Sequence, residues 1–199
     1  MSAPILDLWL RTQYVVGGLM VTQNEGTAGG TVQCGDGSTA GTFPTQLGPV
    51  NGVGHGIVNS NNLTYLQYLA ALANATYTYM ALCSCLHNTQ PQYLFDARSG
   101  GGTGYFYIVV AGDVLTPSSG VVYVDGVPAT AMPLGSITCV TVAGIALNAP
   151  SKLVLLSQNA FGASQGFGGK VFNQRLFSGT LSPAQIATET SRLKALLNT

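Results

Sequence analysis

Few side chains in this sequence could carry chemistry: its 199 residues include 7 acidic residues, 2 histidines and 4 cysteines. Retaining cleavage of a glycosidic bond needs two carboxyl groups about 5–5.5 Å apart, which on one strand face means acids at i and i+2 or i+4. The only glutamates, Glu25 and Glu189, lie far apart in the chain, and no two aspartates have this spacing. We therefore expect that the protein is not an enzyme.

The remaining reactive side chains do not form a recognisable metal or nucleotide motif. Neither His55 nor His87 has a cysteine or carboxylate at the spacing of a zinc site or a catalytic triad. Cys83-Ser84-Cys85 is too tight for a zinc pair and has no second pair. The aspartates are scattered beside glycines and turns, which is typical of turn residues. No glycine-rich phosphate loop is present, and we expect no cofactor and no metal.

The four cysteines allow two interpretations. Cys83 and Cys85 lie two residues apart in one expected strand and so share a face, while Cys34 and Cys139 lie elsewhere. Free buried cysteines behave as small apolar residues, which is what we expect in a protein that assembles in the cytosol. The alternative is disulfide formation in an oxidising medium, within the chain or between subunits if Cys83 and Cys85 point outward.

Charge is unusually scarce. Charged residues make up 7% of the chain, and the formal net charge is +0, whereas soluble domains carry about 25% charged residues. No Asp, Glu, Lys or Arg lies between Asp36 and Asp96, or between Asp125 and Lys152. Such a surface is either neutral and polar or packed against neighbouring subunits. Because near-zero net charge promotes association, we expect an assembly protein.

Nothing in the sequence predicts a membrane span or a secretory signal. Polar residues and prolines interrupt every apolar stretch before the roughly 20 residues that a spanning helix needs. The N-terminal stretch MSAPILDLWLRTQ has no basic start followed by an apolar run. Without a basic cluster the chain also lacks an electrostatic attraction for nucleic acid or an anionic membrane, so we expect neither as a partner.

Two groups of aromatic and aliphatic residues are candidates for contacts. Five residues that follow a neutral polar run are expected at an interface between subunits: Tyr65, Leu66, Tyr68, Leu69 and Leu72. Tyr105 and Tyr107 follow a run of glycines and are candidates for glycan contact. Aromatic residues at i and i+2 of a strand also fit a core or an interface.

The elements that must position these residues are mostly strands. Runs rich in β-branched and aromatic residues, separated by Gly, Pro and Asn, predict short antiparallel strands. They cover 5–10, 75–86, 93–95, 105–110, 121–124, 137–146, 152–156 and 167–176. Asp125-Gly126 predicts a type I′ hairpin turn, which requires positive φ at both central residues. Residues 24–61 are expected to form a long loop region, and 63–74 a short helix or a strand.

A helix is predicted over 182–197. Ser182 and Gln185 have the spacing of a capping box, and Pro183 occupies the first helical position, where a missing N–H costs nothing. Leu181 and Ile186 have the spacing of a hydrophobic staple. The whole pattern indicates one all-β domain over 1–199, an antiparallel sandwich with a C-terminal helix.

These pieces, in this order, resemble the laminin-G-like and concanavalin A-like jelly rolls. The resemblance is carried by 6–10, 77–86, 93–96, 123–127, and 167–176 running into LSPAQI at 181–186. It implies an antiparallel jelly roll whose rim is covered by the C-terminal helix. Members of the family include lectins, glycan-cleaving enzymes and calcium-binding modules, so the resemblance alone does not fix a function.

Charge-poor domains of this kind also resemble structural proteins of tailed bacteriophages. That resemblance implies a virion protein assembled in the host cytoplasm, either a capsid decoration protein or a tail or fibre component. Its expected partners are copies of itself, as a homotrimer or another cyclic oligomer, and major capsid or tail proteins. The alternative is a lectin-like module that attaches to glycans on the host surface.

Overall fold

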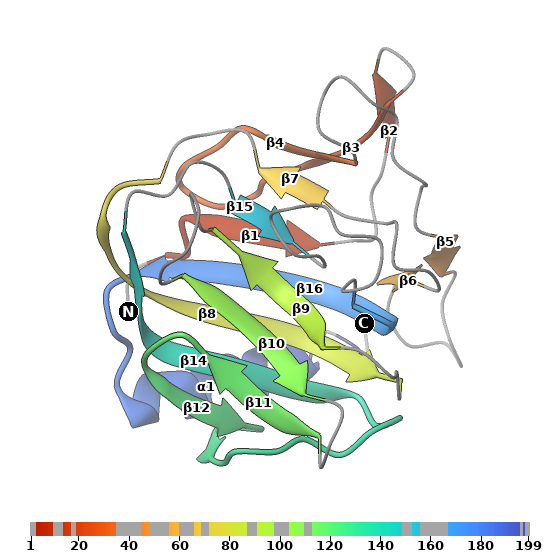
Figure 1. Ribbon diagram of the computed structural model, residues 1–199. Coiled ribbons are helices and arrows are strands. Elements are labelled where there is room, and N and C mark those ends of the chain that lie inside the picture. The colour runs from red at the N-terminus through yellow and green to blue at the C-terminus, as the bar shows by residue number, and fades with distance from the viewer. Residues whose placement is uncertain are drawn as a thin grey trace.

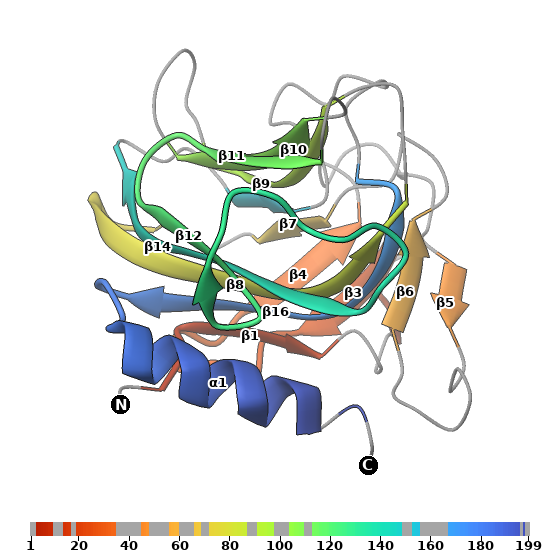
Figure 2. The same ribbon diagram turned by 90° about the horizontal axis from the view of Figure 1, so that it is seen from below.

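Two antiparallel sheets stack face to face, and one helix lies on the outside of one of them (Figures 1 and 2). The structure is a computed structural model that describes residues 3–9, 14–16, 19–34, 45–47, 56–59, 66–68, 72–86, 91–97, 104–109, 113–148, 153–155, 167–195 and 197. Every strand pairing within these ranges is antiparallel. The expected all-β sandwich with a C-terminal helix is confirmed.

The first sheet, sheet A, has three long central strands flanked by short ones. Its order is β13 (Val127–Pro128), β12 (Val121–Val124), β14 (Thr138–Leu147), β8 (Ala75–Cys85), β16 (Gly169–Ser178), β6 (Gly56–Asn59) and β5 (Thr45–Leu47), and β1 (Leu6–Trp9) also pairs with β16. The predicted hairpin turn joins β12 to β13, and φ is 53° at Asp125 and 83° at Gly126. The turn prediction is therefore confirmed.

The second sheet, sheet B, is built from shorter strands. Its order is β11 (Val114–Pro117), β10 (Tyr105–Val109), β9 (Gln92–Asp96), β15 (Leu153–Leu155), β7 (Leu66–Tyr68), β4 (Thr31–Cys34), β3 (Leu19–Gln23) and β2 (Tyr14–Val16). Figure 1 looks onto this sheet, with sheet A and the helix behind it.

Aromatic rings fill the centre of the space between the sheets. The ring of Tyr79 in sheet A lies 4.5 Å from that of Phe95 and 6.2 Å from that of Phe106, both in sheet B. All three side chains are fully buried. Burying a large apolar side chain stabilises a fold by about 1.5–3 kcal/mol, so these contacts hold the sheets together.

The helix α1 (Pro183–Ala195) buries the other face of sheet A (Figure 2). Ile186, Leu193 and Leu197 pack against apolar side chains of the sheet, among them Met80 and Phe177. The capping box is present: the amide of Ser182 donates to Oε1 of Gln185 at 2.8 Å, and the amide of Gln185 donates to Oγ of Ser182 at 3.3 Å. Because both faces of sheet A are covered, β8 is continuously buried from Tyr77 to Cys85.

A buried ion cluster lies between α1 and sheet A. Arg175 of β16 is 2% exposed, and its guanidinium contacts Asp7 Oδ2 at 3.0 Å and Glu189 Oε2 at 2.7 Å. Asn173 donates to Asp7 Oδ1 at 2.9 Å. The cluster therefore joins β1, β16 and α1 through one side chain.

One prediction about the first half of the chain is wrong, and one open alternative is decided. Within the expected loop region 24–61, three segments are strands, β4, β5 and β6. For 63–74, where a short helix and a strand were both expected alternatives, residues 66–68 form a strand, β7, between β15 and β4. The alternation of buried and exposed side chains that identifies this strand covers only three residues. Leu66 and Tyr68 point into the core, and Gln67 between them is partly exposed.

Replacing Arg175 tests whether the ion cluster holds α1 in place. Arg175→Met leaves two carboxylates without their guanidinium, and breaking a buried pair in this way costs about 3–5 kcal/mol of unfolding free energy. Arg192→Met is the matched control, because Arg192 contacts the same Glu189 at 3.5 Å but is 63% exposed, and exposed pairs contribute less than about 1 kcal/mol. Urea unfolding measures both variants, and equal losses of stability would contradict the assignment.

Candidate functional site

Three tyrosines gather on the outer face of sheet B, and we call them the tyrosine cluster. Tyr93 comes from β9, and Tyr105 and Tyr107 come from β10. The ring of Tyr107 lies 5.6 Å from that of Tyr105, nearly parallel to it, and 5.0 Å from that of Tyr93. Tyr93 is 7% exposed and supports the other two, which are half-buried. The cluster therefore presents aromatic surface to the exterior.

A β-bulge brings the cluster together. Tyr93 lies opposite Tyr107, and Asp96 lies opposite Tyr105, so residues three apart on β9 face the same side. Strict alternation would place them on opposite faces. The register shift between Phe106 and Tyr107 gives β9 one extra residue, and a bulge of this kind re-aims the side chains beyond it.

The described strands of sheet B carry a single charged residue, Asp96. Its side chain is buried, and it lies in a row across the outer face with Tyr105, Val154 and Gln67. Lysine and arginine occur in the described residues only on β16 and α1, which belong to the opposite side of the sandwich. Within the described part of sheet B, the tyrosine cluster therefore has Asp96 as its one acidic neighbour and no lysine or arginine.

The expected interface residues do not form an exposed group. Leu66 and Tyr68 are buried in the core between the sheets, and the Tyr68 hydroxyl donates to the Gly29 carbonyl at 3.0 Å. Leu72 is partly buried against the same core. Tyr65 and Leu69 lie outside the described residues. For Leu66 and Tyr68 the interface prediction is wrong, because β7 is an inner strand whose alternate side chains point into the sandwich.

Three of the four cysteines are free, buried thiols: Cys83, Cys85 and Cys139. Cys83 and Cys85 share a face, as predicted, and that face is the core. A bond between subunits through an outward-facing Cys83–Cys85 pair is therefore excluded in the folded chain. Cys139 lies under α1, where it accepts from the Thr190 hydroxyl at 3.7 Å. The side chain of Cys34, on β4, lies outside the described part of the chain.

Carboxylates distant in sequence do converge, but on a cation rather than in an open groove. Asp7 and Glu189 both bind Arg175 beneath α1. Within the described residues, no three His, Cys, Asp or Glu side chains lie close enough together to hold a metal ion. Nor does any helix in this part of the chain have the length and apolar character of a membrane span.

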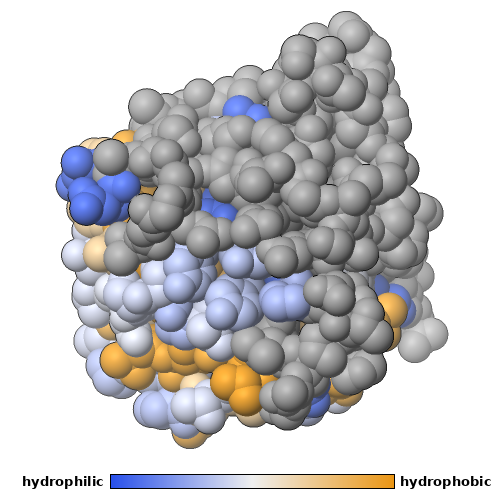
Figure 3. Space-filling model, in the orientation of Figure 1, coloured by the Kyte–Doolittle hydropathy of each residue, from blue (hydrophilic) through white to orange (hydrophobic). Residues whose placement is uncertain are grey.

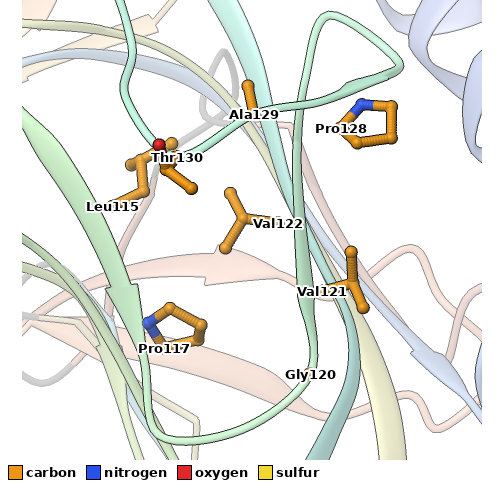
Figure 4. A pocket seen from close by; sticks show the side chains of 8 residues that line it. All are labelled: Leu115, Pro117, Gly120, Val121, Val122, Pro128, Ala129 and Thr130. Atoms are coloured by element: carbon orange, nitrogen blue, oxygen red, sulfur yellow. The ribbon is translucent and has the colours of Figure 1, made fainter.

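An apolar groove of about 630 Å³ lies at the edge of the sandwich, between β11 and β12 (Figure 4). It is lined by Leu115, Pro117, Gly120, Val121, Val122, Pro128, Ala129 and Thr130. Figure 3 shows a hydrophobic band over β11 and β12, below the paler side chains over β9 and β10. Sequence reasoning missed this groove, because it did not predict β11.

Comparisons with known proteins add little to this geometry. No protein-family model and no curated protein matches the chain. One solved structure, from work showing that cell entry of botulinum neurotoxin type C depends on interaction with two ganglioside molecules, aligns with a TM-score of 0.46 and 10% identity. The alignment covers 96% of this chain and 51% of the other, so this chain spans about half the length of that structure.

The buried thiols predict a loss of stability at alkaline pH. Burial raises the pKa of Cys139 from 9.0 to about 11 and that of Cys85 to about 12. The unfolded chain therefore releases these protons first, and stability falls as the pH rises from about 9 to 11. For Cys139 this loss is roughly 2–3 kcal/mol.

Urea unfolding as a function of pH measures this effect. Cys139→Val removes one thiol, and we expect a shallower decline above about pH 9 than in the parent chain. The same decline in both proteins would contradict the assignment.

Proposed function

We propose that the protein is a non-enzymatic binding module that recognises neutral glycans through the tyrosine cluster. The observation that supports this proposal is the packing of Tyr105 against Tyr107, with ring centroids 5.6 Å apart, on a partly exposed sheet face. Tyrosine combines a large apolar ring with a hydroxyl that can hydrogen-bond. A pyranose ring has the matching character, with C–H groups on one face and hydroxyls around its edge.

The charge of the site favours neutral sugars over acidic ones. Acidic sugars carry carboxylates or sulfates, which proteins bind with arginine or lysine. The described strands of sheet B contain neither residue type, and their one charge is the buried carboxylate of Asp96. Among the described residues of sheet B, a negative charge placed here would meet the carboxylate of Asp96 and no lysine or arginine. We therefore assign neutral oligosaccharides as the ligand class.

The same geometry supports a role without catalysis. Hydrolysis of a glycan by paired carboxylates requires two of them at one open site. Of the acids in the described residues, Asp7 and Glu189 are neutralised by Arg175 and covered by α1, and Asp96 is the only acid on the strands of sheet B. Binding alone accounts for the arrangement.

Glycan-array binding with tyrosine variants tests this function. We expect Tyr107→Ala to reduce the signal for neutral oligosaccharides at least about tenfold, since it removes the central ring of the cluster. Tyr107→Phe keeps the ring and should retain most of the binding. Val127→Ala, at a side chain that is 63% exposed on the hairpin away from the cluster, is the control. Absence of any glycan signal from the parent chain would reject the proposal.

A second candidate function is that of a structural subunit of a tailed-bacteriophage virion, in the capsid decoration or in a tail or fibre. The observation that favours it is exposed apolar surface at one sandwich edge, where Val114, Val121 and Val127 are 38%, 55% and 63% exposed. A chain with +0 net charge has little electrostatic repulsion to keep copies apart. Its partners would be further copies in a cyclic oligomer, and capsid or tail proteins.

Charge insertion at this edge tests the assembly role. If copies pack through it, Val121→Asp with Val127→Asp should raise the dissociation constant of the oligomer at least about tenfold, because it buries unpaired charges. Thr188→Asp, on the exposed side of α1, is the matched control. Light scattering coupled to gel filtration measures the mass of each protein. A parent chain that is monomeric at all concentrations would contradict this role.

A further inference from the structure

The turn after β11 forms hydrogen bonds with the backbone of Tyr105, the first residue of β10. Oγ of Ser118 accepts hydrogen bonds from the amides of Gly104 and Tyr105, at 2.7 and 3.2 Å. The amide of Ser118 donates to the carbonyl of Tyr105 at 2.9 Å. Both backbone polar groups of Tyr105 are thus bound by one residue of the turn.

The backbone at Gly104, just before β10, is closely confined. Gly104 has φ of 109°, a conformation that residues with a side chain rarely adopt. A Cβ at this position would lie 3.0 Å from Cδ2 of Leu147 in β14. The Gly104 carbonyl accepts from the amide of Ala97 at 2.8 Å. The backbone that carries Tyr105 is therefore fixed on one side by packing and on the other by Ser118.

The neighbouring serine makes a bond of the same kind to the other sheet. Oγ of Ser119 accepts from the amide of Ala146 in β14 at 2.9 Å. Ser119 therefore links the turn to sheet A, whereas Ser118 links it to the tyrosine cluster. Ser118 and Ser119 are adjacent, and the hydroxyl of each accepts from backbone amides, but in different sheets, so they provide a matched pair for experiment.

We propose that Ser118 is a positioning residue of the glycan site, which sets the packing of Tyr105 against Tyr107 by holding the Gly104–Tyr105 backbone. This inference rests on the proposed glycan-binding function for its biological meaning. Ser118 acts through Tyr105 and needs no contact with the sugar. Without its hydroxyl, two partly buried amides lose their acceptor, and the strand start shifts toward water to replace it.

Three variants test the proposal: Ser118→Ala, Ser118→Thr and Ser119→Ala. Ring-proton chemical shifts of Tyr105 and Tyr107 report the packing directly, without any ligand. Titration calorimetry with the neutral hexasaccharides cellohexaose, mannohexaose and xylohexaose reports the affinity. We expect Ser118→Ala to move the ring shifts and to weaken binding about fivefold to tenfold. Ser118→Thr keeps a hydroxyl and should restore both properties, and Ser119→Ala should lower thermal stability alone.

The outcomes separate the positioning role from the glycan function. Unchanged ring shifts in Ser118→Ala would overturn the positioning role, as would an equal displacement in Ser119→Ala, which would indicate general loosening of the turn. If no hexasaccharide binds the parent chain while the ring shifts still distinguish Ser118→Ala from Ser119→Ala, the positioning role stands and the glycan function fails.

Discussion

The structure depends on the covering of sheet A by α1, which closes the outer face of that sheet. The apolar contacts of Ile186 and Leu193 bury the outer face of this sheet, and Arg175 binds carboxylates from β1 and α1 beneath the helix. Because an unpaired buried charge is costly, this cluster requires all three elements to be in place. Among the residues whose side chains the structure describes, the partly exposed aromatic ones of the outer surface, Tyr105 and Tyr107, lie on sheet B.

The same constraint explains which elements could be predicted from the sequence. The helix and the β12–β13 turn were predictable because their sequence signals are local: a capping box at Ser182, and the Asp125-Gly126 pair, at which φ is positive in the structure. The strand over 75–85 was recognisable by composition, but its burial on both faces was not, since α1 lies a hundred residues further on. β7 was ambiguous, because its three residues are too few for a periodicity to show.

The candidate site could be predicted only in part. Tyr105 and Tyr107 were identifiable, since their i, i+2 spacing puts them on one strand face. Tyr93 joins them only through the bulge in β9, and a register shift leaves no pattern in a single strand. Ser118 could not be identified from the sequence either, because its hydrogen-bond partners lie 13 and 14 positions earlier in the chain. The prediction of an interface at Leu66 and Tyr68 was wrong, because both side chains pack in the core of their own chain.

The central claim is that recognition takes place on the outer face of sheet B, on the aromatic rings of the tyrosine cluster. A crystal structure of the protein soaked with a neutral hexasaccharide tests it most directly. We predict that a sugar ring packs on Tyr107 or Tyr105, with electron density for no more than a few sugar units of the hexasaccharide. A sugar bound in the groove between β11 and β12, or against α1, with the tyrosine cluster empty, would contradict it.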